Sequence, residues 1–118
     1  MHEHINYKQF TEEEGRIYTK GIEMIRATIS DGVKFDIACD MVTIEDSEMK
    51  GLVIDDALKI EIAELHFGKG LTLREVSKRL GVSVQRLMNA REEMLEDVMN
   101  TAQASELMKY DEGPTFSS

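Results

Sequence analysis

Apolar residues recur three or four positions apart along most of the chain, which is the spacing of helices that bury one face. The first such run follows Thr11, where a hydroxyl side chain precedes three glutamates. Thr11 followed by Glu14 has the pattern of a capping box, and Asp31-Gly32 predicts the end of this helix. Ile17, Gly21, Met24, Ile25 and Ile29 fall near helical spacing in this run.

Two short helices are expected before residue 55. VKFDIACDMV (33–42) and DSEMKGLVI (46–54) each have the length and the apolar content of a short helix. The β-branched residues of KFDIACDMVTI (34–44) leave a strand as the alternative for the first of them. We predict helices at both places.

A longer helix is expected from Asp55 or Asp56, either of which has a side chain that can cap it, through Phe67. Gly68 and Gly70 then end the helix, because glycine readily adopts the left-handed conformation at a helix C-terminus. The apolar side of this helix consists of Leu58, Ile62 and Leu65.

The clearest pattern in the chain begins at Thr72. Thr72 and Glu75 form a second capping-box signature in front of a helix over 73–80. Ser83 can cap a last helix that extends as far as Tyr110. Two helices joined by so short a turn predict a helix-turn-helix.

The residues that hold a helix-turn-helix together stand at the required positions. Ser77 is small where the two helices cross, and Gly81 four positions later tolerates the positive φ that the turn needs. The apolar inner faces of the two helices are formed by Val76, Leu80, Val82, Leu87 and Ala90.

These elements define the expected architecture. The fold class is all-α: a helical bundle containing a helix-turn-helix, with a long C-terminal helix. Residues 1–54 form an N-terminal helical region for packing, dimerisation or partner contact. Residues 55–110 form the helix-turn-helix domain with its extended C-terminal helix, and residues 111–118 form a flexible tail.

Charge is distributed unevenly along the chain. The 118 residues carry 23 acids and 14 bases, a net charge of −9, which argues against indiscriminate nucleic-acid binding. Between Lys69 and Arg91, however, there are six basic residues and one acid, Glu75, which gives a local charge of +5. This basic segment coincides with the predicted helix-turn-helix, and it therefore favours a local DNA site.

The outward positions at the start of the last helix predict how DNA is read. In a helix-turn-helix this end of the second helix enters the major groove. Gln and Asn can pair with adenine edges, Arg can pair with guanine, and Val can touch a thymine methyl group. The predicted base-reading residues are Ser83, Val84, Gln85, Arg86, Met88 and Asn89. The predicted phosphate contacts, which fix register without reading sequence, are Thr72, Arg74, Lys78, Arg79 and Arg91.

Residues 58–98, LKIEIAELHFGKGLTLREVSKRLGVSVQRLMNAREEMLEDV, resemble region 4 of bacterial sigma factors and LuxR-type output domains. The resemblance is carried by a helix ending in LHFGKGLT, then by LREVSKRLGVS, then by a reading helix that runs through ARE to a late leucine. It implies a bacterial transcription regulator that binds double-stranded DNA through residues 83–91. RNA polymerase or another regulator is a further candidate partner. The residues before 55 lie outside the resemblance.

The last helix is longer than a DNA reader requires. Apolar residues continue along it at Met94, Leu95, Val98, Met99, Ala102, Leu107 and Met108. Two copies could bury this seam and place two readers one DNA turn apart, so we expect a homodimer. The alternative is that the helix folds back on residues 11–30 to complete the core.

A second class of function remains open beside DNA binding. The same helix-turn-helix could be a protein-interaction module, an adaptor or an anti-sigma-like protein, because basic residues on a helix are often only a solvated face. No phosphate-binding glycine loop, nucleophile elbow or HExxH pattern occurs, so an enzyme, a cofactor or a metal is not expected. His2, Glu3 and His4 could touch a metal, but they are a weak metal pattern because alternating histidines at a mobile N-terminus are more often unstructured.

The cysteine content and the distribution of apolar runs indicate the cellular compartment in which the protein is expected. The single cysteine, Cys39, precludes an intramolecular disulfide and is expected to be a small buried apolar residue. The N-terminus has no apolar signal-peptide region, and no apolar run approaches the roughly 18 residues of a membrane span. We therefore expect a cytoplasmic protein without a membrane partner.

Overall fold

Two capping boxes begin two of the helices in the computed structural model, which describes the backbone of residues 10–111 and side chains as far as residue 99. In α1 (Glu12–Ser30), the Thr11 hydroxyl accepts from the backbone N–H of Glu14, and the Glu14 carboxylate accepts from that of Thr11, both at 3.0 Å. In α4 (Leu73–Leu80), Thr72 and Glu75 make the same exchange at 3.1 and 2.8 Å. Both predicted capping boxes are confirmed.

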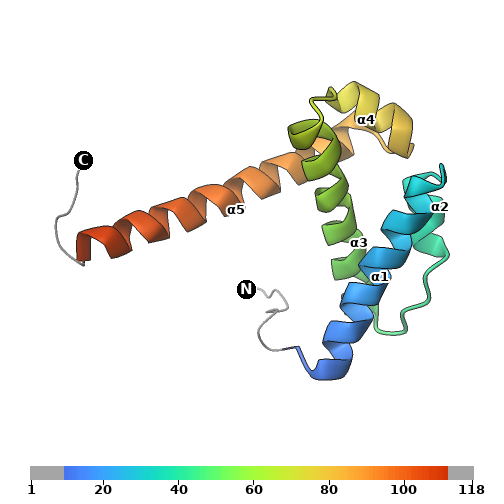
Figure 1. Ribbon diagram of the computed structural model, residues 1–118, viewed down its shortest axis with the longest axis horizontal. Helices are drawn as coiled ribbons and strands as arrows, with labels where there is room; N and C mark the ends of the chain where they lie inside the picture. Colours follow the sequence, from blue (N-terminus) through green and yellow to red (C-terminus); the bar gives the residue numbers. More distant parts are fainter. Residues whose placement is uncertain (1–9, 112–118) are drawn as a thin grey trace.

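The segment predicted as either helix or strand is a helix, α2 (Phe35–Asp40). It is followed by α3 (Ser47–Ile62), which continues as a π-helical segment, η2 (Ala63–Gly68). With α5 (Val84–Asp111), these elements make the described part of the chain an all-α bundle containing a helix-turn-helix, and the predicted fold class is confirmed (Figure 1).

The predicted helix start at Asp55 or Asp56 is wrong. Asp46 is the cap, and its carboxylate accepts from the backbone N–H groups of Glu48 and Met49 at 2.9 and 3.2 Å. The two helices expected on either side of residue 55 are therefore one helix, which crosses the expected boundary between residues 54 and 55. Asp56 instead accepts a 2.6 Å hydrogen bond from the Tyr18 hydroxyl of α1.

The core forms where α1 and α5 pack against α3, α2 packs against α1, and α4 packs against α5 and η2 (Figure 1). The approach of α1 to α3 is close at Gly21, where a β-carbon would lie 3.1 Å from Cγ1 of Val53 and 3.2 Å from Cδ1 of Ile44. This contact explains a glycine inside α1, where it otherwise disfavours the helix. The largest fully buried side chains are Phe35, Ile25, Ile62, Leu80, Leu87, Val53 and Val76.

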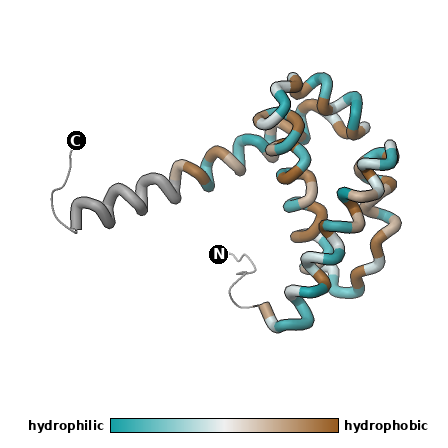
Figure 2. Tube along the Cα trace, viewed as in Figure 1, coloured by the Kyte–Doolittle hydropathy of each residue, from teal (hydrophilic) through white to brown (hydrophobic). Residues whose placement is uncertain are grey.

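The long helix α5 has two different halves. Its first turns pack against α3 and α4, where Lys59 of α3 pairs with Glu93 at 3.0 Å. Its later half projects away from α1 and the other helices (Figure 1), so it does not fold back on residues 11–30. Hydrophobic positions occur on α5 where it leaves the bundle (Figure 2), and Leu95, Val98 and Met99 of this helix are 46%, 63% and 59% exposed.

The last helix ends close to its predicted position. The last helix extends to Asp111, one residue past the predicted end at Tyr110. The rest of the predicted flexible tail, 112–118, and the weak metal pattern at His2, Glu3 and His4 lie outside the described residues. Within residues 10–111 no helix has both the length and the apolar character needed to cross a bilayer.

Cys39 is buried in α2, as expected, and is 3% exposed. Burial raises the pKa of its thiol to about 11, with a smaller contribution from the nearby carboxylate of Asp36. The thiol is therefore protonated at neutral pH, and protonated thiols are poor nucleophiles. Cys39 acts as a packing residue.

Candidate nucleic-acid interface

The turn between α4 and α5 is fixed by four residues. Gly81 ends α4 with φ +74° and donates its backbone N–H to the carbonyl of Ser77 at 2.8 Å. The Ser77 hydroxyl donates to the carbonyl of Val82 at 2.5 Å, which ties the turn back to α4. Ser83 then caps α5, because its hydroxyl accepts from the backbone N–H of Arg86 at 3.1 Å.

The packing between α4 and α5 is apolar and buried. All of the predicted apolar residues of the helix-turn-helix are buried, and none of them is more than 9% exposed. A buried apolar contact of this kind holds two helices in one relative orientation. The set comprises Val76, Leu80, Val82, Leu87 and Ala90.

This packing leaves one side of the first turns of α5 facing solvent. We call this side the outer face of α5; it consists of Ser83, Val84, Gln85, Met88 and Asn89, all of which are exposed. Gln85 Nε2 donates to Asn89 Oδ1 at 3.0 Å, so two amide side chains lie side by side, one helical turn apart. Their remaining donors and acceptors face outward, which suits hydrogen bonding to an external partner.

Arg86, which the sequence placed with these residues, lies elsewhere. Its Nη1 donates to both carboxylate oxygens of Asp36 in α2, at 3.0 and 3.1 Å. Its guanidinium carbon also lies 5.3 Å from the centre of the Phe35 ring, within the range of a cation–π contact. Arg86 therefore joins α5 to α2 in this structure and is not part of the outer face.

Arg91 is also turned inward. Its Nη1 lies 3.3 Å from Nε2 of His66 in η2, and its Nε is buried without a hydrogen-bond partner among the described residues. His66 Nδ1 lies 2.7 Å from the carbonyl of Leu71, which can only accept, so Nδ1 carries a proton and Nε2 accepts from Arg91. This arrangement gives Arg91 a packing role between α5 and η2, away from the other predicted phosphate contacts.

The predicted phosphate contacts on α4 are exposed. Arg74, Lys78 and Arg79 reach solvent, and their side chains have no partner among the described residues. The Thr72 hydroxyl is occupied by the capping box, although Thr72 itself is exposed at the start of the helix. Of the six cations from Lys69 to Arg91, three therefore lie on α4. Arg86 and Arg91 make contacts inside the bundle, and Lys69 lies directly after η2.

Lys34 contacts the end of α4, a contact that no local sequence pattern predicts. Its Nζ donates to the carbonyls of Lys78 and Arg79 at 3.0 and 3.4 Å, and so caps the C-terminus of α4. A β-carbon on Gly81 would lie 3.0 Å from Cδ of Lys34, so this stem occupies the space beside the glycine. Spacing cannot reveal the contact, because 44 residues separate Lys34 from Lys78.

Comparison with known proteins gives no independent assignment: no family model matches the chain, and neither the curated proteins nor the solved structures contain a significant match. Only the geometry of the molecule therefore bears on its function. The geometry is a rigid helix-turn-helix, an exposed face with two amides, and three exposed cations on the neighbouring helix.

Proposed function

We propose that this protein is a transcription regulator that binds double-stranded DNA in a sequence-specific manner. The observation that carries the proposal is the paired amides of Gln85 and Asn89 on the solvent side of a capped, tightly packed helix-turn-helix. The first turns of the second helix are the part that enters the major groove in proteins of this architecture. The outer face of α5 would contact base edges there.

The electrostatics support the same surface. Phosphate contacts contribute much of the affinity for DNA, and they require cations beside the reading helix. Arg74, Lys78 and Arg79 supply those cations from α4, and Thr72 supplies an exposed hydroxyl at the start of the same helix. A chain with a net charge of −9 would be repelled elsewhere along the duplex, so the basic helix would determine how the protein approaches DNA.

The salt dependence of binding tests this surface. Arg74→Gln and Lys78→Gln should each weaken binding to all duplexes alike and should reduce the slope of log K against log salt concentration by about 0.9. Fluorescence anisotropy between roughly 50 and 200 mM salt measures that slope. Lys20→Gln is the matched control, because Lys20 is an exposed lysine on α1. Equal slopes for all four proteins would exclude α4 as the phosphate-binding helix.

Asp36→Asn should raise DNA affinity, because it releases Arg86 from the pair that joins α5 to α2 and removes a negative charge beside the reading helix. We expect a gain of about threefold to tenfold at moderate salt, since one additional charged contact is worth about 1 kcal/mol at an exposed site. Asp40→Asn makes the same charge change on the same helix, where Asp40 has no partner among the described residues. An equal gain from Asp40→Asn would attribute the effect to net charge, and no gain from Asp36→Asn would show that Arg86 is not a latent contact.

The projecting half of α5 is the proposed dimerisation element. Leu95, Val98 and Met99 are exposed there on a helix that leaves the bundle, and isolated apolar helices gain stability by pairing. A dimer through α5 would place two outer faces on the same duplex. RNA polymerase or another regulator could use the same apolar helix.

A protein-interaction module is the alternative proposal. It is favoured by the inward positions of Arg86 and Arg91, which remove two cations from the basic segment, and by the exposed apolar residues of α5. On that account an adaptor or anti-sigma-like partner would bind α5, and no duplex would be selected over another. The same salt titration separates the two proposed functions. Only for a DNA reader should substitutions on α4 change the slope of log K against log salt concentration.

A further inference from the structure

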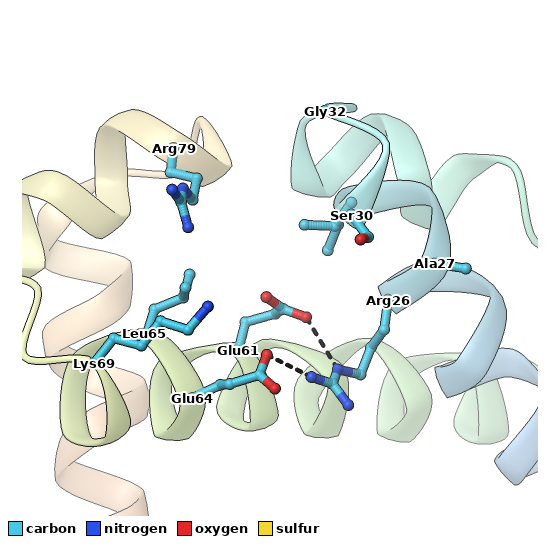
Figure 3. Close-up of a pocket in the computed structure, with 10 residues that line it drawn as sticks. Arg26, Ala27, Ser30, Gly32, Glu61, Glu64, Leu65, Lys69 and Arg79 are labelled. Carbon is cyan, nitrogen blue, oxygen red and sulfur yellow. Dashed lines mark hydrogen bonds and ion pairs between the residues drawn. The ribbon is translucent and has the colours of Figure 1, made fainter.

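A cleft opens between the C-terminal end of α1, η2 and the end of α4. Its volume is about 720 Å³, which lies within the range of small-molecule sites. Ala27, Ser30 and Gly32 line it from the end of α1, Glu61 and Leu65 from α3 and η2, and Arg79 from α4 (Figure 3). The cleft thus borders the helix-turn-helix without including the outer face of α5.

One wall of the cleft is a fixed ion cluster. Arg26 Nε donates to Glu61 at 3.1 Å, and Arg26 Nη2 donates to Glu64 at 2.6 Å. The hydrogen bond from Arg26 lowers the pKa of the Glu64 carboxyl, and the two glutamates in turn raise the pKa of Arg26. Both pairs use the charge of Arg26, and with two carboxylates against one guanidinium this wall carries a net charge of −1.

The other wall carries two cations, of which Lys69 is near enough to Glu64 to help lower the pKa of that carboxyl. Lys69, directly after η2, and Arg79, on the last turn of α4, both line the cleft, and neither side chain has a partner among the described residues. Figure 3 shows both side chains directed into the space between α4 and α1. These two cations outweigh the net charge of −1 on the opposite wall and leave the lining with a net charge of +1, which favours a small anion beside them.

We propose that this cleft binds a compact dianion, a phosphate group or a small dicarboxylate, held between the Lys69 ammonium and the Arg79 guanidinium. Arg79 offers a planar pair of donors that suits carboxylate or phosphate oxygens, and Lys69 offers a point charge that suits either. Binding itself does not depend on DNA. If the proposed DNA function also holds, a bound anion would occupy Arg79 and would weaken the binding of α4 to the DNA phosphates.

The test is a two-dimensional ¹⁵N NMR titration of the whole chain without DNA, with inorganic phosphate in one series and succinate in another, at fixed ionic strength. We expect saturable shifts confined to residues 27–32, 64–69 and 79. Lys69→Gln and Arg79→Gln should each weaken binding about tenfold or more, because each removes a charged hydrogen bond. Lys78→Gln should change it less than twofold, because Lys78 makes the same charge change on α4 but does not line the cleft.

The outcomes separate the possibilities. Saturation with phosphate alone or succinate alone supports the site and names its ligand class. The site would be overturned if neither anion saturated the chain. It would also be overturned if Lys78→Gln lost as much anion affinity as Lys69→Gln and Arg79→Gln. The spectra also report whether each variant is folded. Because no DNA is present, a negative anion titration would leave the proposed DNA function untested by this experiment. Failure of DNA binding would likewise leave the anion titration unaffected.

Discussion

Replacing Phe35 by alanine is expected to lower the free energy of unfolding by about 3–5 kcal/mol, the range for deleting a fully buried aromatic side chain. Phe35 is 0% exposed at the start of α2, between the cap that Lys34 places on α4 and the pair that Asp36 makes with Arg86. The substitution opens a cavity and removes the ring beneath the Arg86 guanidinium. The free energy of unfolding of a domain is roughly 5–15 kcal/mol, so the loss would be a large part of the stability.

Urea unfolding followed by far-ultraviolet circular dichroism measures this loss. Ile37→Ala is the control on the same helix, because Ile37 is 56% exposed and should cost less than about 1 kcal/mol. A similar loss in both variants would mean that α2 is held by its helical propensity alone. A loss below about 1 kcal/mol in Phe35→Ala would contradict the packing of α2 against the helix-turn-helix.

Asn89→Ala is expected to weaken binding to the preferred duplex by about 1–3 kcal/mol, or roughly 5- to 150-fold, and Gln85→Ala by a similar amount. Each amide is proposed to make hydrogen bonds to a base edge, and these bonds carry sequence information. The two losses should not add, since Gln85 donates to Asn89 and each residue positions the other. Affinity for an unrelated duplex should stay the same, because phosphate contacts are retained.

Competition binding with preferred and scrambled duplexes measures both effects. Thr19→Ala serves as the control, since Thr19 is an exposed polar residue on α1, far along the chain from the helix-turn-helix. Uniform weakening on every duplex would indicate that the amides only support the helix. Unchanged discrimination in both amide variants would place base reading away from the outer face of α5.

The sequence predicted best those features whose causes lie within a few residues. Each capping box spans four residues, and the turn depends on Ser77, Gly81 and Ser83, so the local pattern alone specifies α4 and the start of α5. The buried faces of both helices follow from the same short-range periodicity.

The rest depends on contacts that a local pattern does not contain. Asp55 and Asp56 have side chains as suitable for capping as that of Asp46, and only packing against α1 makes α3 continuous through them. Arg86 pairs with a residue 50 positions away, and Arg91 lies against one 25 positions away. Spacing predicts DNA contacts for both arginines because it shows which face of a helix they occupy but not which neighbour lies against that face.

Selection from a random duplex library at moderate salt tests the central proposal most directly. The purified chain, shown to be folded, is incubated with the library, and the retained duplexes are sequenced. Base reading by the outer face of α5 predicts an enriched motif, and dimerisation through α5 further predicts two half-sites about one helical turn apart. Absence of any enriched motif from the folded protein would contradict the DNA-reading function and would favour a protein-interaction module.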